Sequence, residues 1–154
     1  MTKQLKALCV SAGLPWNDEV PDACVFELDN GLVTTCQADE QTGDLLLETA
    51  LTPVPPERRE AAASMIAAAN YRGMLTDGAC LGLDPAGGGV LLFRRLPLAS
   101  LDADAFLRVL TRFLDVAEQM NAALESVGQS RSVGLAGGVY TGHTDVPAPF
   151  QVAI

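Results

Sequence analysis

The 154-residue sequence is poor in positive charge, in aromatic side chains and in histidine. It has 10 lysine and arginine residues against 19 aspartate and glutamate residues, a formal net charge of −9, 5% aromatic residues and one histidine. Nucleic-acid-binding surfaces neutralise phosphates with clustered cations, and single-stranded bases stack on aromatic rings. Because cationic and aromatic side chains are both scarce, we expect no nucleic-acid partner. The shortage of cations also predicts that no anionic membrane is bound.

Long apolar runs and closely spaced cysteines are also missing. No apolar stretch approaches the roughly 20 residues that cross a bilayer, and the first stretch is interrupted by Lys6, which does not fit a secretory signal. The cysteines are too widely spaced for a C-x-x-C pair: Cys9, Cys24, Cys36 and Cys80. We therefore expect a cytoplasmic protein with free, buried thiols, no bound metal and no cofactor.

Acidic charge is concentrated in the first third of the chain. Between Lys6 and Arg58 every charged side chain is an aspartate or a glutamate. Such a stretch keeps a protein soluble as a solvated face, or it attracts a basic partner. The sequence leaves both interpretations open.

Apolar spacing in the first half predicts a helix followed by three strands. A stripe at helical spacing covers residues 2–13 and ends at Gly13, which Pro15 follows. Apolar residues at period two predict a strand at 23–28, β-branched residues predict a return strand at 32–38, and a polar turn leads to a third strand at 45–51. Asn30-Gly31 is a strong hairpin-turn signal, so these strands form an antiparallel meander.

The second half predicts a helix, a hairpin and a long helix. An alanine-rich helix covers about residues 55–72, strands at 79–83 and 90–96 flank a glycine-rich turn, and a long amphipathic helix begins near Ser100 and ends at Gly128. The fold class is therefore α+β, with a single domain at 1–128. Residues 129–154 are a glycine- and proline-rich tail that we expect to be flexible or loosely docked.

Catalytic motifs are weak. His143, which a histidine-based active site would need, lies in the tail, and Gly137–Thr144 resembles a phosphate-binding loop but lacks its lysine. A hairpin turn explains Gly87–Gly89, while solvation and helix dipoles explain the paired carboxylates. We therefore expect a non-catalytic protein that binds polypeptide, because exposed strand edges pair with extended segments.

Short motifs in the second half resemble those of a known family. They are Ala69-Asn70-Tyr71, Thr76–Ala79, Leu81–Pro85, and Arg95–Leu98 leading to Leu101-Asp102 and the apolar stripe of the last helix. Their order, together with the order of the predicted elements, the size and the acidity, resembles the class I type III secretion chaperones of Gram-negative bacteria. The resemblance covers about residues 2–127.

The resemblance implies a homodimer that binds the N-terminal region of a secreted effector in extended form, keeps it soluble and secretion-competent, and has no catalytic activity. It implies effector-binding patches on the first helix and adjoining strands: Leu5, Leu8, Val33, Thr35, Leu45 and Leu47. It implies a dimer contact on the second helix and the nearby strand: Ala62, Met65, Ile66, Ala69, Leu81 and Leu83. Each of these residues also fits an ordinary core position.

Two other functions remain open at this point. A non-catalytic adaptor or regulator would use the same sheet edge to bind a folded partner. A small enzyme would centre on His143 or Cys36.

Overall fold

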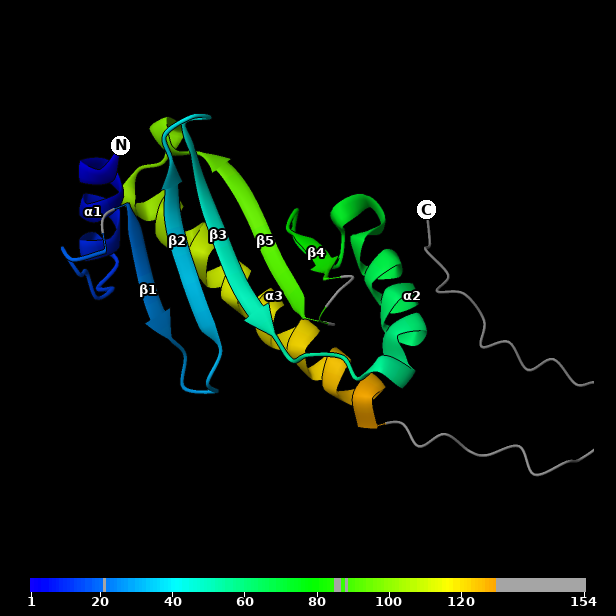
Figure 1. Cartoon of the computed structure of the whole chain (residues 1–154). Helices are drawn as coiled ribbons and strands as arrows, with labels where there is room; N and C mark the ends of the chain where they lie inside the picture. The colour runs from blue at the N-terminus through cyan, green and yellow to red at the C-terminus, as the bar shows by residue number, and fades with distance from the viewer. Residues whose placement is uncertain (21, 85–86, 88, 130–154) are drawn as a thin grey trace, which may run out of the picture.

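The structure, a computed structural model, describes residues 1–20, 22–84, 87 and 89–129. Figure 1 shows a sheet with helices along one face and at its two sides. The elements follow one another as α1 (Thr2–Ser11), β1 (Ala23–Glu27), β2 (Val33–Asp39), β3 (Asp44–Leu51), α2 (Arg59–Asn70), β4 (Cys80–Leu83), β5 (Val90–Pro97) and α3 (Ala103–Gln129). The predicted α+β class and order of elements are confirmed. The predicted tail, His143 and the loop-like motif at 137–144 lie outside the described residues.

The five strands form one antiparallel sheet in the order β1-β2-β3-β5-β4. The predicted meander and second hairpin are both confirmed. The sequence did not reveal how they join: β5 pairs with β3 along its whole length, from Asp44↔Pro97 to Leu51↔Val90. As a result β1 and β4 are the two edges of the sheet.

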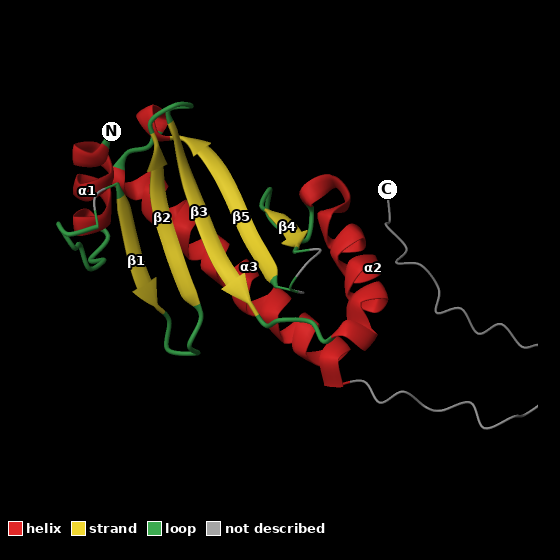
Figure 2. Ribbon diagram, in the orientation of Figure 1, coloured by secondary structure: helices red, strands yellow, loops and turns green. Residues whose placement is uncertain are grey.

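The helices divide the sheet into a covered face and an open face. In Figure 2, α3 crosses behind the strands, α1 lies beside β1, and α2 lies beside β4. Alternation along β3 follows this division: Leu45 and Leu47 are buried under the helices, whereas Leu46 and Glu48 lie on the other side. We call the side without helices the open face.

The covered face contains one buried polar pair. Thr34 on β2 and Thr49 on β3 are direct cross-strand partners, and their hydroxyl oxygens are 2.8 Å apart. Both side chains are fully buried. Each hydroxyl therefore satisfies the other inside an otherwise apolar core, which avoids the cost of an unpaired buried polar group.

Helix α3 has the apolar stripe that the sequence predicts. The Asp102 carboxylate accepts a hydrogen bond from the backbone N–H of Ala105 at 2.7 Å and so caps the N-terminus. The buried residues follow at spacings of three and four: Phe106, Leu110, Phe113, Val116, Ala117, Met120 and Leu124. The helix continues to Gln129, one residue beyond the predicted end.

Helix α2 is shorter than predicted. A 3₁₀ turn at Pro56–Arg58 precedes it, and it ends at Asn70 rather than at Arg72. Arg72 and Gly73 adopt positive φ angles of 59° and 65°, which the right-handed helix excludes. The alanine-rich segment itself is helical, as its high propensity predicts.

The expectation that all four cysteines are buried is wrong for one of them. Cys9, Cys24 and Cys36 are buried, but Cys80 is exposed. Cys80 is the cross-strand partner of Phe93, which pairs with Glu48, so its side chain lies on the open face of the sheet. No helix within the described ranges is long and apolar enough to cross a membrane.

Candidate functional site

The open face of the sheet has an apolar surface. Val25 on β1 and Val33 on β2 are 49% and 45% exposed, and Leu91 on β5 is also exposed. Half-buried Phe93 on β5 and exposed Ala50 on β3 lie on the same face. Large apolar side chains left in water on neighbouring strands are typical of a surface that binds another polypeptide.

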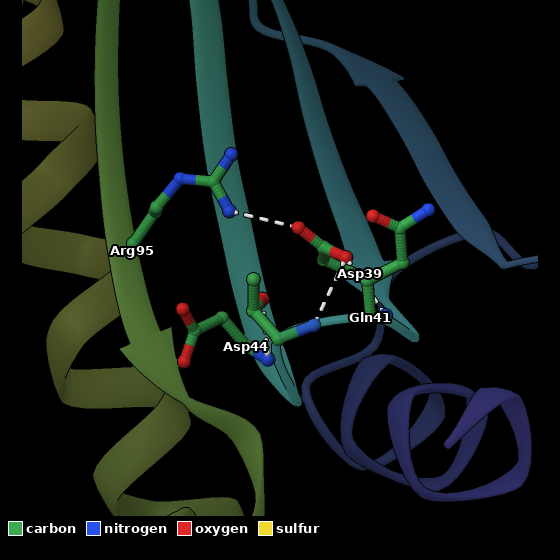
Figure 3. Close-up of polar contacts among 5 residues, drawn as sticks. Asp39, Gln41, Asp44 and Arg95 are labelled. Carbon is green, nitrogen blue, oxygen red and sulfur yellow. Dashed lines mark hydrogen bonds and ion pairs between the residues drawn. The ribbon is translucent and has the colours of Figure 1, made fainter.

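Charged residues bound this surface at the β2–β3 turn. The guanidinium of Arg95 on β5 donates to the Asp39 carboxylate at 3.0 Å, which joins β5 to β2 across β3. Figure 3 shows that Asp39 also accepts a hydrogen bond from the backbone N–H of Gln41, at 3.0 Å. The Arg95 guanidinium has the largest effect in lowering the pKa of the Asp39 carboxyl, and the backbone hydrogen bond from Gln41 lowers it further. The carboxylate therefore stays charged and holds the turn.

The β1 edge has unpaired backbone groups directed outward. The Leu28 N–H donates to the Leu32 carbonyl, and the Ala38 N–H donates to the Asp22 carbonyl. These two bonds fix which residues of β1 direct their backbone groups toward β2 and which direct them outward. In this alternation the N–H and C=O groups of Ala23, Val25 and Glu27 point away from β2. An extended segment is able to pair with them as an additional strand.

A hollow lies beside this edge. It is lined by the loop after α1 and by the first half of β1: Pro15, Trp16, Asn17, Val20, Ala23 and Val25. The Cys24 thiol donates to the Pro15 carbonyl at 2.9 Å, and the Lys6 ammonium lies 5.9 Å from the Trp16 ring centre. These contacts hold the loop against α1 and β1, so the hollow is formed in advance of any binding.

The β4 edge differs because a side chain occupies it. The Asn70 amide, at the end of α2, donates to the Leu81 carbonyl at 2.9 Å and accepts from the Leu81 N–H at 2.8 Å. Asp84 donates to Gly89 in the hairpin, so the outward-facing residues of β4 are Leu81 and Leu83. Asn70 therefore blocks strand addition at the middle of this edge.

The turn after α2 exposes large apolar residues. Met74 is 74% exposed, and Tyr71 and Leu75 are also exposed. The turn is closed by Thr76, whose hydroxyl donates to the Ala79 carbonyl at 2.6 Å, and by the Gly78 N–H, which donates to the Gly73 carbonyl. These apolar side chains are therefore presented on an ordered turn.

The residues proposed for effector binding fall into two groups. Val33 is exposed and Thr35 half-buried on the open face, while Leu5, Leu8, Leu45 and Leu47 are buried between the sheet and the helices. The sequence analysis missed Val25 and Leu91. Both residues lie in predicted strands, but the sequence did not show which side of each strand the helices cover.

The residues proposed for the dimer contact are also mostly internal. Met65 and Leu83 are half-buried, while Ala62, Ile66, Ala69 and Leu81 are buried between α2, β4 and the rest of the core. The sequence analysis missed Tyr71, Met74 and Leu75, although three large apolar residues beside Gly73 and ahead of a strand were a usable signal.

The described part of the chain shows no group of three or more histidine, cysteine, aspartate or glutamate residues arranged to hold a metal ion. The Cys9 thiol interacts with Cys36, and this contact together with burial raises its pKa. Burial raises the pKa of Cys24 to about 12. Such thiols remain protonated at neutral pH, which makes them poor nucleophiles. Cys36, the other residue considered for catalysis, is fully buried.

Comparison with known proteins agrees with this geometry. The family model described as the Tir chaperone protein (CesT) family matches residues 5–121. The chain belongs to the CesT family. The match includes all five strands and both apolar surfaces, and it ends within α3. A search of curated protein sequences finds no match.

Solved structures share the CesT-family fold at low sequence identity. A chain of the ExsC–ExsE complex is 23% identical, with a TM-score of 0.59, over 80% of this chain and 92% of that chain. A chain of the heterodimeric ExoU–SpcU complex from the type III secretion system of Pseudomonas aeruginosa is 18% identical, with a TM-score of 0.60, over 80% and 96%. YbjN, a putative transcription regulator from E. coli, is 12% identical, with a TM-score of 0.60, over 80% and 89%.

Proposed function

We propose that this CesT-family chain is a cytoplasmic, non-catalytic chaperone of type III secretion. As a homodimer it binds the N-terminal region of a secreted effector in extended form and keeps that region soluble and competent for secretion. Family membership supports the general function. The solved complexes ExsC–ExsE and ExoU–SpcU support an effector as the partner.

The β1 edge is the observation that carries the effector site. Val25 combines outward-directed backbone groups with a side chain on the open face, and the hollow at Trp16 and Val20 adjoins it. An added strand would gain backbone hydrogen bonds from Val25 and apolar contacts from Val33. Thr35, the cross-strand partner of Val25, would form the floor of the same site.

The four buried residues of the proposed effector site act indirectly. Leu5 and Leu8 pack the inner side of α1, and Leu45 and Leu47 pack the inner side of β3. They hold the helix and the sheet that carry the exposed contact residues. Direct contact with the effector is proposed for Val33 and Thr35, together with Val25.

The dimer contact is proposed on α2 and the turn that follows it. Met65 and Leu83 are half-buried at this side of the molecule, and the exposed Met74 and Leu75 extend the surface. Ala62, Ile66, Ala69 and Leu81 support the surface from inside. Covering Met74 and its neighbours would remove the largest apolar exposure of the described chain from water.

The first experiment is co-expression with the N-terminal fragment of an effector encoded beside this protein, followed by light scattering of the purified product. We expect the protein alone to be a dimer of about 32 kDa, twice the 16.1 kDa chain, and the co-expressed complex to be soluble and heavier by the mass of the fragment. An effector lacking its N-terminal region is the matched control. A monomer that leaves the fragment insoluble, or a complex formed only with a folded effector domain, would contradict the proposal and favour an adaptor.

A further inference from the structure

Three arginines and one carboxylate line a pocket on the covered side of the sheet. Arg94 on β5 is the cross-strand partner of Leu47, so it lies on the face opposite the effector site proposed above. Arg108 and Arg112 lie on α3. They line a pocket of about 260 Å³, together with the following residues: Asp77, Arg94, Ala105 and Val109.

Asp77 balances only part of this positive charge. Its carboxylate lies 3.3 Å from the Arg94 guanidinium and 3.9 Å from that of Arg112. Arg108 forms no hydrogen bond or ion pair with another described residue. Among the residues that line the pocket, three cations and one anion leave a charge of +2, in a chain whose net charge is −9.

The two helical arginines are placed to share a ligand. Arg108 and Arg112 are four residues apart on α3, so they lie one above the other on the same face. Like charges at this spacing repel and destabilise a helix. An anion bound between them would remove the repulsion, and a guanidinium matches a carboxylate with two parallel hydrogen bonds.

The surroundings indicate a polypeptide rather than a small ion. On the side away from Asp77, the same two arginines line a second hollow with the exposed Leu107 and with Thr111. The arginines therefore lie between a charged pocket and an apolar surface. A segment that alternates acidic and apolar side chains matches this arrangement along α3.

We propose that this surface binds an acidic polypeptide segment, with one carboxylate held between Arg108 and Arg112 and an apolar neighbour placed on Leu107. The Asp77 carboxylate accepts a hydrogen bond from Arg94 and so holds that side chain in place, and the two residues together form one wall of the pocket. The inference goes beyond effector binding at β1, because the two sites lie on opposite faces of the sheet. Failure of one leaves the other intact.

The test uses the full chain and follows the arginine side-chain N–H signals by NMR. The probes are a capped peptide of alternating glutamate and leucine, its glutamine–leucine counterpart, and inorganic phosphate. We expect the glutamate peptide to shift the Arg108 and Arg112 signals, to bind at least tenfold more tightly than the glutamine peptide, and to weaken as salt rises.

The variant Arg108→Gln/Arg112→Gln should reduce that affinity at least tenfold. Lys3→Gln, an exposed cation on α1, is the charge control and should leave it unchanged. Equal binding of the two peptides would overturn the proposal. Phosphate binding at the same arginines as tightly as the glutamate peptide would also overturn it, because the site would then be one for small anions. The peptide comparison on the unaltered protein remains decisive if the double variant fails to fold.

Discussion

The side-chain amide of Asn70 forms two hydrogen bonds with the backbone of Leu81, at 2.9 Å to its carbonyl and 2.8 Å from its N–H. One residue at the end of α2 thus acts as a short substitute for a neighbouring strand. It also joins α2 to β4, the two elements proposed for the dimer contact.

Replacing Asn70 should destabilise the protein measurably. Asn70→Ala leaves the Leu81 N–H and C=O without their partner, which we expect to lower the free energy of unfolding by about 1–2 kcal/mol in urea titrations. Asn70→Asp retains the acceptor oxygen but places a second carboxylate oxygen against the Leu81 carbonyl, so it should be no more stable than Asn70→Ala. Unchanged stability of Asn70→Ala would show that water satisfies this edge equally well.

Blocking the β1 edge should abolish effector binding without unfolding the sheet. In Val25→Pro the lost N–H is one that points away from β2, so the β1–β2 hydrogen bonds remain. We expect the co-expressed effector fragment to be lost from the complex, as measured by pull-down.

Val25→Thr is the matched control, because it keeps the backbone donor and the branched side chain and should still bind. Thermal unfolding of both variants checks that each is folded. Wild-type binding by a folded Val25→Pro would rule out strand addition at this edge.

Met74 offers a direct test of the dimer contact. Because it is exposed in the single chain, Met74→Glu should leave the fold intact while placing a carboxylate in the proposed interface. We expect a penalty of about 3 kcal/mol or more, which is over 100-fold in the dimer dissociation constant. Sedimentation over a range of concentrations measures it.

Val10→Glu, on the exposed side of α1, is the control and should remain dimeric. Met65→Glu is less informative, since Met65 already packs against the core of its own chain. An undisturbed Met74→Glu dimer would place the contact elsewhere.

The buried Thr34–Thr49 pair predicts a non-additive pair of substitutions. Thr34→Val alone leaves the Thr49 hydroxyl buried without a partner and should cost about 1–3 kcal/mol, and Thr49→Val should behave alike. The double variant replaces both hydroxyls with methyl groups of similar shape. It should recover most of that loss in a double-mutant cycle, whereas additive losses would mean that the hydroxyls do not depend on each other.

Local signals in the sequence predicted most of the fold. Asn30-Gly31, the period-two apolar residues at 23–28 and the stripe of α3 each specify an element through neighbouring residues. The pairing of β3 with β5 depends on residues about 40–50 positions apart, and no local pattern encodes it. The order of the strands therefore became evident only in three dimensions.

The site was harder to predict because core and binding surface use the same side chains. Leu45 and Val33 are both aliphatic residues of predicted strands, yet the first is buried under the helices and the second faces water. Which phase is covered depends on where the helices pack, and that is a tertiary property. The same ambiguity explains the error at Cys80.

Because Asn70 occupies the middle of the β4 edge while the β1 edge is available at Val25, strand addition as proposed here would make each chain monovalent toward an incoming strand. A monovalent chain stops the extension of the sheet, because it accepts one extended segment and has no second free edge for another. Chains that expose two free edges can propagate into fibrils. A protein that holds an aggregation-prone segment on one edge, with the middle of the other obstructed, is instead limited to a finite complex.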